Sequence, residues 1–177
     1  NEALTAINWL CERGVNINNI SLCGDSAGAH LAASVTHTIA NENRQNVHSQ
    51  FLIYPMCDPH CKSNSIELFK EGYLLTKKAM EWFWDKFRNS LADNDVNTFN
   101  LLLLEPEKKI PKTIIVTAGF DPLLDEAEKY AFLLHKNGTY VKQLHYPSLF
   151  HGFANMTRLK SAKKAVDDFL SEYKEIL

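Results

Sequence analysis

Ser26 stands in a short, small-residue segment that is typical of a catalytic nucleophile. The pentapeptide Gly-Asp-Ser-Ala-Gly at 24–28 follows the apolar run 20–23 and precedes a helix-like segment that starts near residue 30. A serine on a sharp strand-to-helix turn projects its hydroxyl above the sheet, and small neighbours let the strand and the helix approach closely. We therefore expect Ser26 to be a nucleophile, with Gly24 and Gly28 meeting the steric demand of the turn. Taken alone, the same pattern also occurs in ordinary turns.

A carboxylate and a histidine follow Ser26 in an order that suits its activation. Asp121 comes after the apolar run 113–119, and His151 comes after the run 140–145. Each therefore lies where a parallel strand is expected to end, which is where sheets of this kind place their chemistry. The order serine, carboxylate, histidine is that of the α/β-hydrolases.

Each candidate also has a structural interpretation. Asp-Pro at 121–122 is an ordinary helix start, with the aspartate as cap and the proline in the first turn. A histidine among aromatic residues, such as His151, is commonly structural. Asp125 is a second carboxylate near the same loop, although its place in the starting helix suits the helix dipole better. His30 lies one turn beyond Ser26 and points away from its hydroxyl, so we expect it to be scaffold.

The periodicity of apolar residues predicts alternating strands and helices around these positions. Short apolar runs bounded by turn residues indicate four parallel strands, at 20–23, 50–54, 113–117 and 140–145. Helical spacing indicates helices at 2–13, 27–40, 124–137 and 162–173. The sequence thus predicts an α/β fold with a partial parallel sheet and flanking helices.

The alternation breaks over about 62–110, which we interpret as an insertion into a single domain that spans 1–177. It carries a strongly helical segment at 77–89 that is rich in aromatic residues, and a polar run at 91–97 that is typical of a loop. No repeat or low-complexity segment is present in the sequence.

Four motifs resemble the hormone-sensitive-lipase family of esterases, near the bacterial acetyl esterases. They are Gly-Asp-Ser-Ala-Gly-Ala-His-Leu-Ala at 24–32, Gly-Tyr-Leu-Leu-Thr at 72–76, Ala-Gly-Phe-Asp-Pro-Leu-Leu-Asp-Glu at 118–126 and His-Gly-Phe at 151–153. The resemblance implies an α/β-hydrolase fold with a helical substrate-binding cap in the insertion, and hydrolysis of small carboxylic esters without a cofactor. It departs from the family at Leu124, where a basic residue is common, and this affects substrate contacts rather than the triad.

The resemblance also assigns roles to individual residues. Ser26 would be the nucleophile, His151 the general base and then acid, and Asp121 the residue that orients the imidazole. The backbone N–H of Ala27 would supply one oxyanion donor. We expect a substrate pocket lined by aromatic side chains, although aromatic stripes are often plain core. The pocket candidates are Tyr73, Trp82, Phe120 and Phe153.

The His-Gly-Gly-Gly segment that completes the oxyanion hole in this family does not occur in the sequence. The chain therefore resembles the carboxyl-terminal portion of an esterase, with impaired activity expected, because loss of one oxyanion donor costs about a hundredfold to a thousandfold. A non-catalytic binding protein or an inactive remnant on the same fold is the alternative. In a carboxyl-terminal portion of this kind, the strand at 20–23 would lie at a sheet edge. We expect a homodimer or a separate amino-terminal segment to pair there.

Composition excludes several classes of partner. With 19 basic against 21 acidic residues, the formal charge of −2 gives no electrostatic reason to expect nucleic acid or an anionic membrane as a partner. No apolar stretch is long enough for a membrane span, and no signal-peptide pattern is present, from which we expect a cytoplasmic protein. The chain is long enough, and apolar enough at 45%, to need no disulfides, so we interpret its 4 cysteines as thiols.

The segment 57–61 spaces two cysteines and a histidine as zinc ligands are sometimes spaced. A second pair of ligands at suitable spacing is missing from the sequence, so we interpret the segment as a loop and expect no metal.

Overall fold

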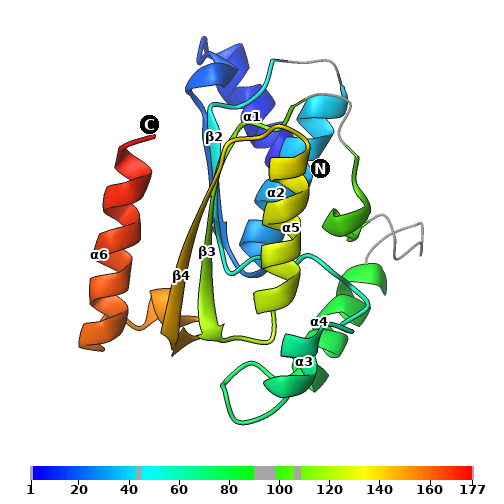
Figure 1. Cartoon of the computed structure of the whole chain (residues 1–177). Coiled ribbons are helices and arrows are strands. Elements are labelled where there is room, and N and C mark those ends of the chain that lie inside the picture. Colours follow the sequence, from blue (N-terminus) through cyan, green and yellow to red (C-terminus); the bar gives the residue numbers. More distant parts are fainter. Residues whose placement is uncertain (1, 43–44, 90–98, 106–108, 177) are drawn as a thin grey trace.

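Four parallel strands form one sheet in the computed structural model of this chain, which describes residues 2–42, 45–89, 99–105 and 109–176 (Figure 1). Their order is β1-β2-β3-β4, each strand pairing in parallel with the next. The strands are β1 (Ser21–Asp25), β2 (Ser49–Ile53), β3 (Lys112–Phe120) and β4 (Val141–Phe150). The predicted α/β fold with a partial parallel sheet of four strands is thereby confirmed.

Helices connect the strands and cover both faces of the sheet. The α-helices are α1 (Glu2–Glu12), α2 (Ala27–Asn41), α3 (Asn64–Leu68), α4 (Lys77–Asn89), α5 (Leu124–Lys136) and α6 (Lys160–Lys174). Short 3-10 turns occur at η1 (Ile17–Asn19), η3 (Leu101–Leu103) and η4 (Phe153–Asn155). Figure 1 shows α2 and α5 on one side of the sheet and α6 on the other.

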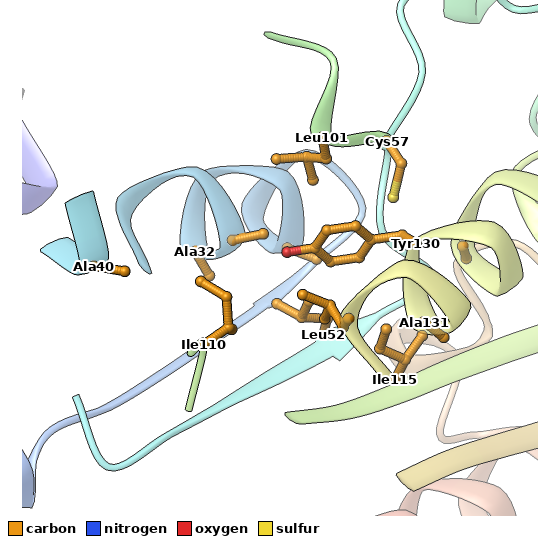
Figure 2. Packing of buried hydrophobic residues seen from close by; sticks show 13 residues of the cluster. Ala32, Ala40, Leu52, Cys57, Leu101, Ile110, Ile115, Tyr130 and Ala131 are labelled. Carbon is orange, nitrogen blue, oxygen red and sulfur yellow. The ribbon is translucent and has the colours of Figure 1, made fainter. Parts of the chain in front are cut away.

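Two apolar clusters hold these layers together. On the α2 and α5 side, the ring of Tyr130 packs with Leu52 of the sheet and with small residues of both helices, such as Ala32 and Ala131 (Figure 2). On the α6 side, Phe169 meets Phe51 of β2 edge-on. Because both faces of the central strands are covered, β2 is buried along its whole length.

Three strands extend further than the apolar pattern predicts, and one of them is β3, which was predicted at 113–117 and runs Lys112–Phe120. β1 continues through Gly24 and Asp25, which still pair with β2 although neither is apolar. β4 reaches Phe150 through Pro147, which is tolerated because β4 is an edge strand of the described sheet. Gly119 allows this close pairing, since a Cβ atom there would lie 2.2 Å from the carbonyl oxygen of Pro147.

The insertion contributes α3 and α4. Helix α4 has the predicted bounds, and its Met80 and Trp84 are buried with Leu123 from the start of α5. The short helix α3, capped by the hydroxyl of Ser63, was too brief to show a helical period in the sequence. The polar run predicted as a loop at 91–97 lies outside the described residues. Within the described ranges, no helix combines the length and the apolar character needed to cross a bilayer.

Candidate active site

Ser26 occupies a strained turn between β1 and α2. Its φ of 52° and ψ of −114° fall in a region that residues other than glycine rarely adopt. The turn is held at both sides: the backbone N–H of Ser26 donates to the carbonyl of Ile53 at 2.9 Å, and its own carbonyl accepts from the N–H of His30 at 3.1 Å. The conformation is therefore fixed by the sheet on one side and by the first turn of α2 on the other.

Only one of the two glycines around Ser26 is needed for close approach in the described structure. A Cβ atom at Gly24 would lie 2.3 Å from the backbone carbonyl of Gly28, so β1 and α2 can meet only because Gly24 has no side chain. A Cβ atom at Gly28 would meet nothing within 4 Å. The steric role predicted for Gly28 was therefore wrong: Gly28 contributes its backbone to the contact with Gly24, and a side chain at Gly28 would not interfere.

Three side chains from distant parts of the sequence form a continuous hydrogen-bonded chain. The Oγ of Ser26 lies 3.0 Å from Nε2 of His151, and Nδ1 of His151 lies 2.9 Å from Oδ2 of Asp121. Asp121 and His151 are buried, at 1% and 8% exposure, whereas Ser26 is partly exposed. An ionised carboxylate can only accept, so Nδ1 carries the proton and Nε2 is left to accept from the serine hydroxyl.

The other two candidates for these positions make different contacts. Asp125 accepts a 2.8 Å hydrogen bond from the backbone N–H of Ser65 and so joins α5 to α3. His30 lies with Nδ1 3.0 Å from the carbonyl of Met56, and burial lowers its pKa to about 4. A neutral, buried His30 fits the scaffold role expected from its place on α2.

A buried carboxyl group fixes the loop that follows β2. Oε1 of Glu126 accepts from the backbone N–H of Cys57 at 2.7 Å and of Asp58 at 3.3 Å. The pKa of Glu126 is raised to about 8, mainly by burial and also by the nearby carboxylates of Asp58 and Asp121, whereas those two hydrogen bonds lower it. Sequence reasoning gave Glu126 no such role, because its partners are backbone groups.

An apolar cavity of about 610 Å³ opens beside Ser26. One wall is the start of α2, and the opposite wall is formed by α4. Its apolar and aromatic lining is Leu31, Met56, Leu75, Met80, Phe83, Trp84 and Phe87. The volume is within the range of small-molecule sites, and the lining is suited to an uncharged, apolar group.

None of the four aromatic residues expected to line a pocket lies in this cavity. Trp82 is 55% exposed on the outer side of α4, and Phe83 and Trp84 line the cavity instead. Phe153 is buried in the core, edge-on to Tyr54. Tyr73 and Phe120 stack on each other with their ring centroids 5.3 Å apart. Contact of these four residues with a substrate therefore stays a prediction. For α4, helical spacing identified the helix but not which of its faces meets α2.

Tyr54 is a site residue that the sequence reasoning missed. Its buried ring lies against the imidazole of His151, with centroids 4.5 Å apart. The signal was its position, since Tyr54 follows β2, which lies between the strands that lead to Ser26 and to Asp121.

All four cysteines are free thiols, and Cys57 and Cys61 are buried. Burial raises the pKa of Cys61 to about 12 and raises that of Cys57 as well. Across the described ranges, no group of three or more His, Cys, Asp or Glu side chains is arranged to hold a metal ion.

Comparisons with protein families, individual proteins and solved structures all match this chain to hydrolases. A family model described as alpha/beta hydrolase fold matches residues 1–155. The carboxylic ester hydrolase LipN of Mycobacterium tuberculosis is 34% identical over 93% of this chain, and the ethyl acetate hydrolase of Pseudomonas putida is 29% identical over 88%. Among solved structures, LAE6, an alpha/beta hydrolase from the metagenome of Lake Arreo in Spain, superposes with a TM-score of 0.80 at 32% identity over 92% of this chain.

The chain spans about half the length of the proteins it matches. It covers 46% of the mycobacterial enzyme, 50% of the Pseudomonas enzyme and 51% of the solved chain.

Proposed function

The chain belongs to the alpha/beta hydrolase fold family, and on that premise we propose that it carries the catalytic residues of a serine esterase acting on small acyl esters. The observation that carries the proposal is the hydrogen-bonded series from Ser26 through His151 to Asp121, with separations of 3.0 and 2.9 Å. The names of its relatives, a carboxylic ester hydrolase and an ethyl acetate hydrolase, support the same reaction class.

In the proposed reaction, His151 takes the proton of Ser26 as its oxygen attacks the ester carbonyl. The resulting imidazolium is held by Asp121 and then gives its proton to the leaving alcohol, so that an acyl-enzyme forms. Water then takes the place of the alcohol: His151 removes its proton, the acyl group is released as the acid and Ser26 is restored. No cofactor enters either step.

The start of α2 is suited to stabilise the oxyanion. The N–H of Ala27, at the first position of the helix, has no partner within the helix and lies next to the nucleophile. We propose that Ala27 supplies one donor. Since a lost donor costs about a hundredfold to a thousandfold in turnover, acyl transfer by this chain is expected to be measurable but slow.

We further propose that 1–177 is one domain and that the insertion at about 62–110 is its cap. The cavity beside Ser26 lies between α2 and α4, so the insertion supplies the wall that faces the nucleophile. An apolar acyl or alcohol group of the ester would occupy this space.

Covalent labelling tests the proposed nucleophile without requiring turnover. A fluorophosphonate that phosphonylates activated serines should add one adduct to the chain, which peptide mass spectrometry locates at Ser26. The variant Ser26→Ala should remain unlabelled. Equal labelling of the parent and of Ser26→Ala would overturn the proposal.

The free edge of β1 supports a separate proposal about assembly. In the described sheet β1 is an edge strand, and a groove of apolar side chains from α1 and α2 runs beside it. We propose that another polypeptide, either a second copy or an amino-terminal segment, pairs with β1. Light scattering at high concentration should then report a dimer of this chain, and a clean monomer that binds no such segment would contradict the proposal.

A further inference from the structure

Asp25, the residue immediately before Ser26, is bonded to the loop that carries His151. Its Oδ2 accepts a 3.1 Å hydrogen bond from the side-chain amide of Asn155, in η4. Ser26 and His151 are 125 positions apart, so only tertiary contacts can fix their separation. A bond from Asp25 to Asn155 ties the two loops together one residue from the serine and four residues from the histidine.

Tyr54 contacts both sides of this junction between the nucleophile turn and the histidine loop. Its hydroxyl donates a long, 3.4 Å hydrogen bond to the same oxygen of Asp25. Its ring is 1% exposed and lies against both the His151 imidazole, at 4.5 Å between centroids, and Phe153 of η4, at 5.6 Å. Tyr54 is itself held by its N–H, which donates to the carbonyl of Val116 at 2.7 Å. The sheet therefore supports the ring, and the ring limits how far the imidazole can move.

The chain turns sharply between His151 and η4. Gly152 has a φ of 82°, a left-handed conformation that glycine adopts without strain. Such a turn reverses the chain but does not by itself fix where η4 lies. The buried ring of Phe153 anchors η4 in the core, and the Asn155 amide ties η4 to Asp25 in the nucleophile turn.

We propose that Asp25, Tyr54 and Asn155 form a brace that sets the imidazole of His151 against Ser26, which makes Asp25 and Asn155 positioning residues of the esterase reaction. This inference rests on the proposed function. It assigns the second residue of the pentapeptide a task distinct from that of the serine: it joins the nucleophile turn to the histidine loop. Small displacements between reacting groups lower rates steeply, so release of the brace should slow the chemical step.

Two variants provide the test: one places a second negative charge at the junction, and the other exchanges the two side chains. Asn155→Asp is nearly isosteric and places two carboxylates face to face, which should push η4 away from Asp25. The double variant Asp25→Asn with Asn155→Asp exchanges donor and acceptor and restores the amide-to-carboxylate pair. The readout is the maximal rate of phosphonylation of Ser26 by a fluorophosphonate, separated from its binding constant.

We expect Asn155→Asp to lower the maximal rate about tenfold with little change in the binding constant, and the double variant to recover most of that loss. Asn89→Asp is the matched control, because Asn89 donates to Asp85 on the exposed part of α4, and it should leave the rate unchanged. Thermal unfolding of each variant shows that the fold is retained. If Asn155→Asp fails to fold, Asn155→Ala takes its place, and the same loss of rate is expected.

Two results would overturn the brace. One is a folded Asn155→Asp variant whose maximal rate of phosphonylation equals that of the parent. The other is a double variant, Asp25→Asn with Asn155→Asp, that reacts as slowly as Asn155→Asp alone. Both leave the proposed function standing as long as labelling of the parent depends on Ser26. Loss of that dependence would instead remove the nucleophile itself.

Discussion

Asp121 accepts a 2.8 Å hydrogen bond from the backbone N–H of Leu123 through Oδ1, the carboxylate oxygen that His151 does not contact. Asp121 is not the N-cap of α5, which is Leu123, but it holds the turn before that helix with one oxygen and lies within hydrogen-bond distance of His151 with the other. The hydrogen bond from Leu123 orients the carboxylate so that its second oxygen faces the imidazole.

This division separates two variants of Asp121. Asp121→Asn keeps an oxygen for Leu123 but loses the charge, and should lower the acylation rate about a thousandfold to ten-thousandfold with little change in stability. Asp121→Ala should show a similar rate and lose about 1 kcal/mol more of the free energy of unfolding, because the hydrogen bond from Leu123 is lost. Fluorophosphonate labelling and urea unfolding measure the two effects. An Asp121→Asn variant that reacts as fast as the parent would contradict the role of the charge.

The turn at Ser26 should tolerate alanine at one glycine and not at the other. Gly24→Ala places its Cβ 2.3 Å from the backbone of Gly28, so we expect a loss of about 3 kcal/mol or more, or a failure to fold. Gly28→Ala meets open space in a helix and should change the free energy of unfolding by less than about 1 kcal/mol. Urea unfolding compares them, and equal losses would show that the close approach of β1 and α2 is not specific to Gly24.

The sequence predicted those parts of the molecule that depend on local pattern. Helix α4 has its predicted bounds because its apolar period is strong. The positions of Ser26, Asp121 and His151 after successive predicted strands indicated that they meet at the carboxyl-terminal edge of the sheet. The ends of β1, β3 and β4 were missed because strand pairing continues beyond the apolar residues. Tyr54 was missed because its place under His151 depends on tertiary packing. Trp84 lines the cavity and Trp82 does not, a difference that the helical period alone does not predict because it does not say which neighbour a helix face meets.

Glu126 should make stability depend on pH in a defined window. Its pKa is raised from 4.5 to about 8 in the folded chain, so the folded state holds the proton more tightly than the unfolded one. The free energy of unfolding gained from this group is present below pH 4.5 and is lost as the pH rises toward 8. In Glu126→Gln that loss should be absent, because the side chain keeps one oxygen for the loop and cannot ionise.

Urea unfolding of both proteins at several pH values measures the difference. His30 and His37 act in the opposite direction, since burial lowers the pKa of each from 6.5 to about 4 and their contribution is lost as the pH falls through that range. Both proteins contain these histidines, so their effect cancels in the difference. A difference between parent and variant that does not change between pH 5 and 8 would contradict the raised pKa of Glu126.

The cavity beside Ser26 should determine how long a chain the substrate can carry. Leu31 lines it from α2 and is 48% exposed, so Leu31→Trp can fill part of the cavity without disturbing the core. We expect about a tenfold loss of acylation by p-nitrophenyl octanoate and little loss with the acetate. Leu68→Trp, at a 71% exposed position outside this cavity, is the control. Equal losses with both esters would show that the cavity does not hold the chain of the substrate.

Acylation of Ser26 is tested most directly by a stopped-flow burst with p-nitrophenyl acetate, on the parent chain and on Ser26→Ala. We predict a burst of p-nitrophenol of about one equivalent per chain from the parent, followed by a slow steady phase, because we expect hydrolysis of the acyl-enzyme to be slower than acylation by this activated ester. Ser26→Ala should give no burst. Identical traces from the two proteins would contradict the assignment of Ser26 as the nucleophile.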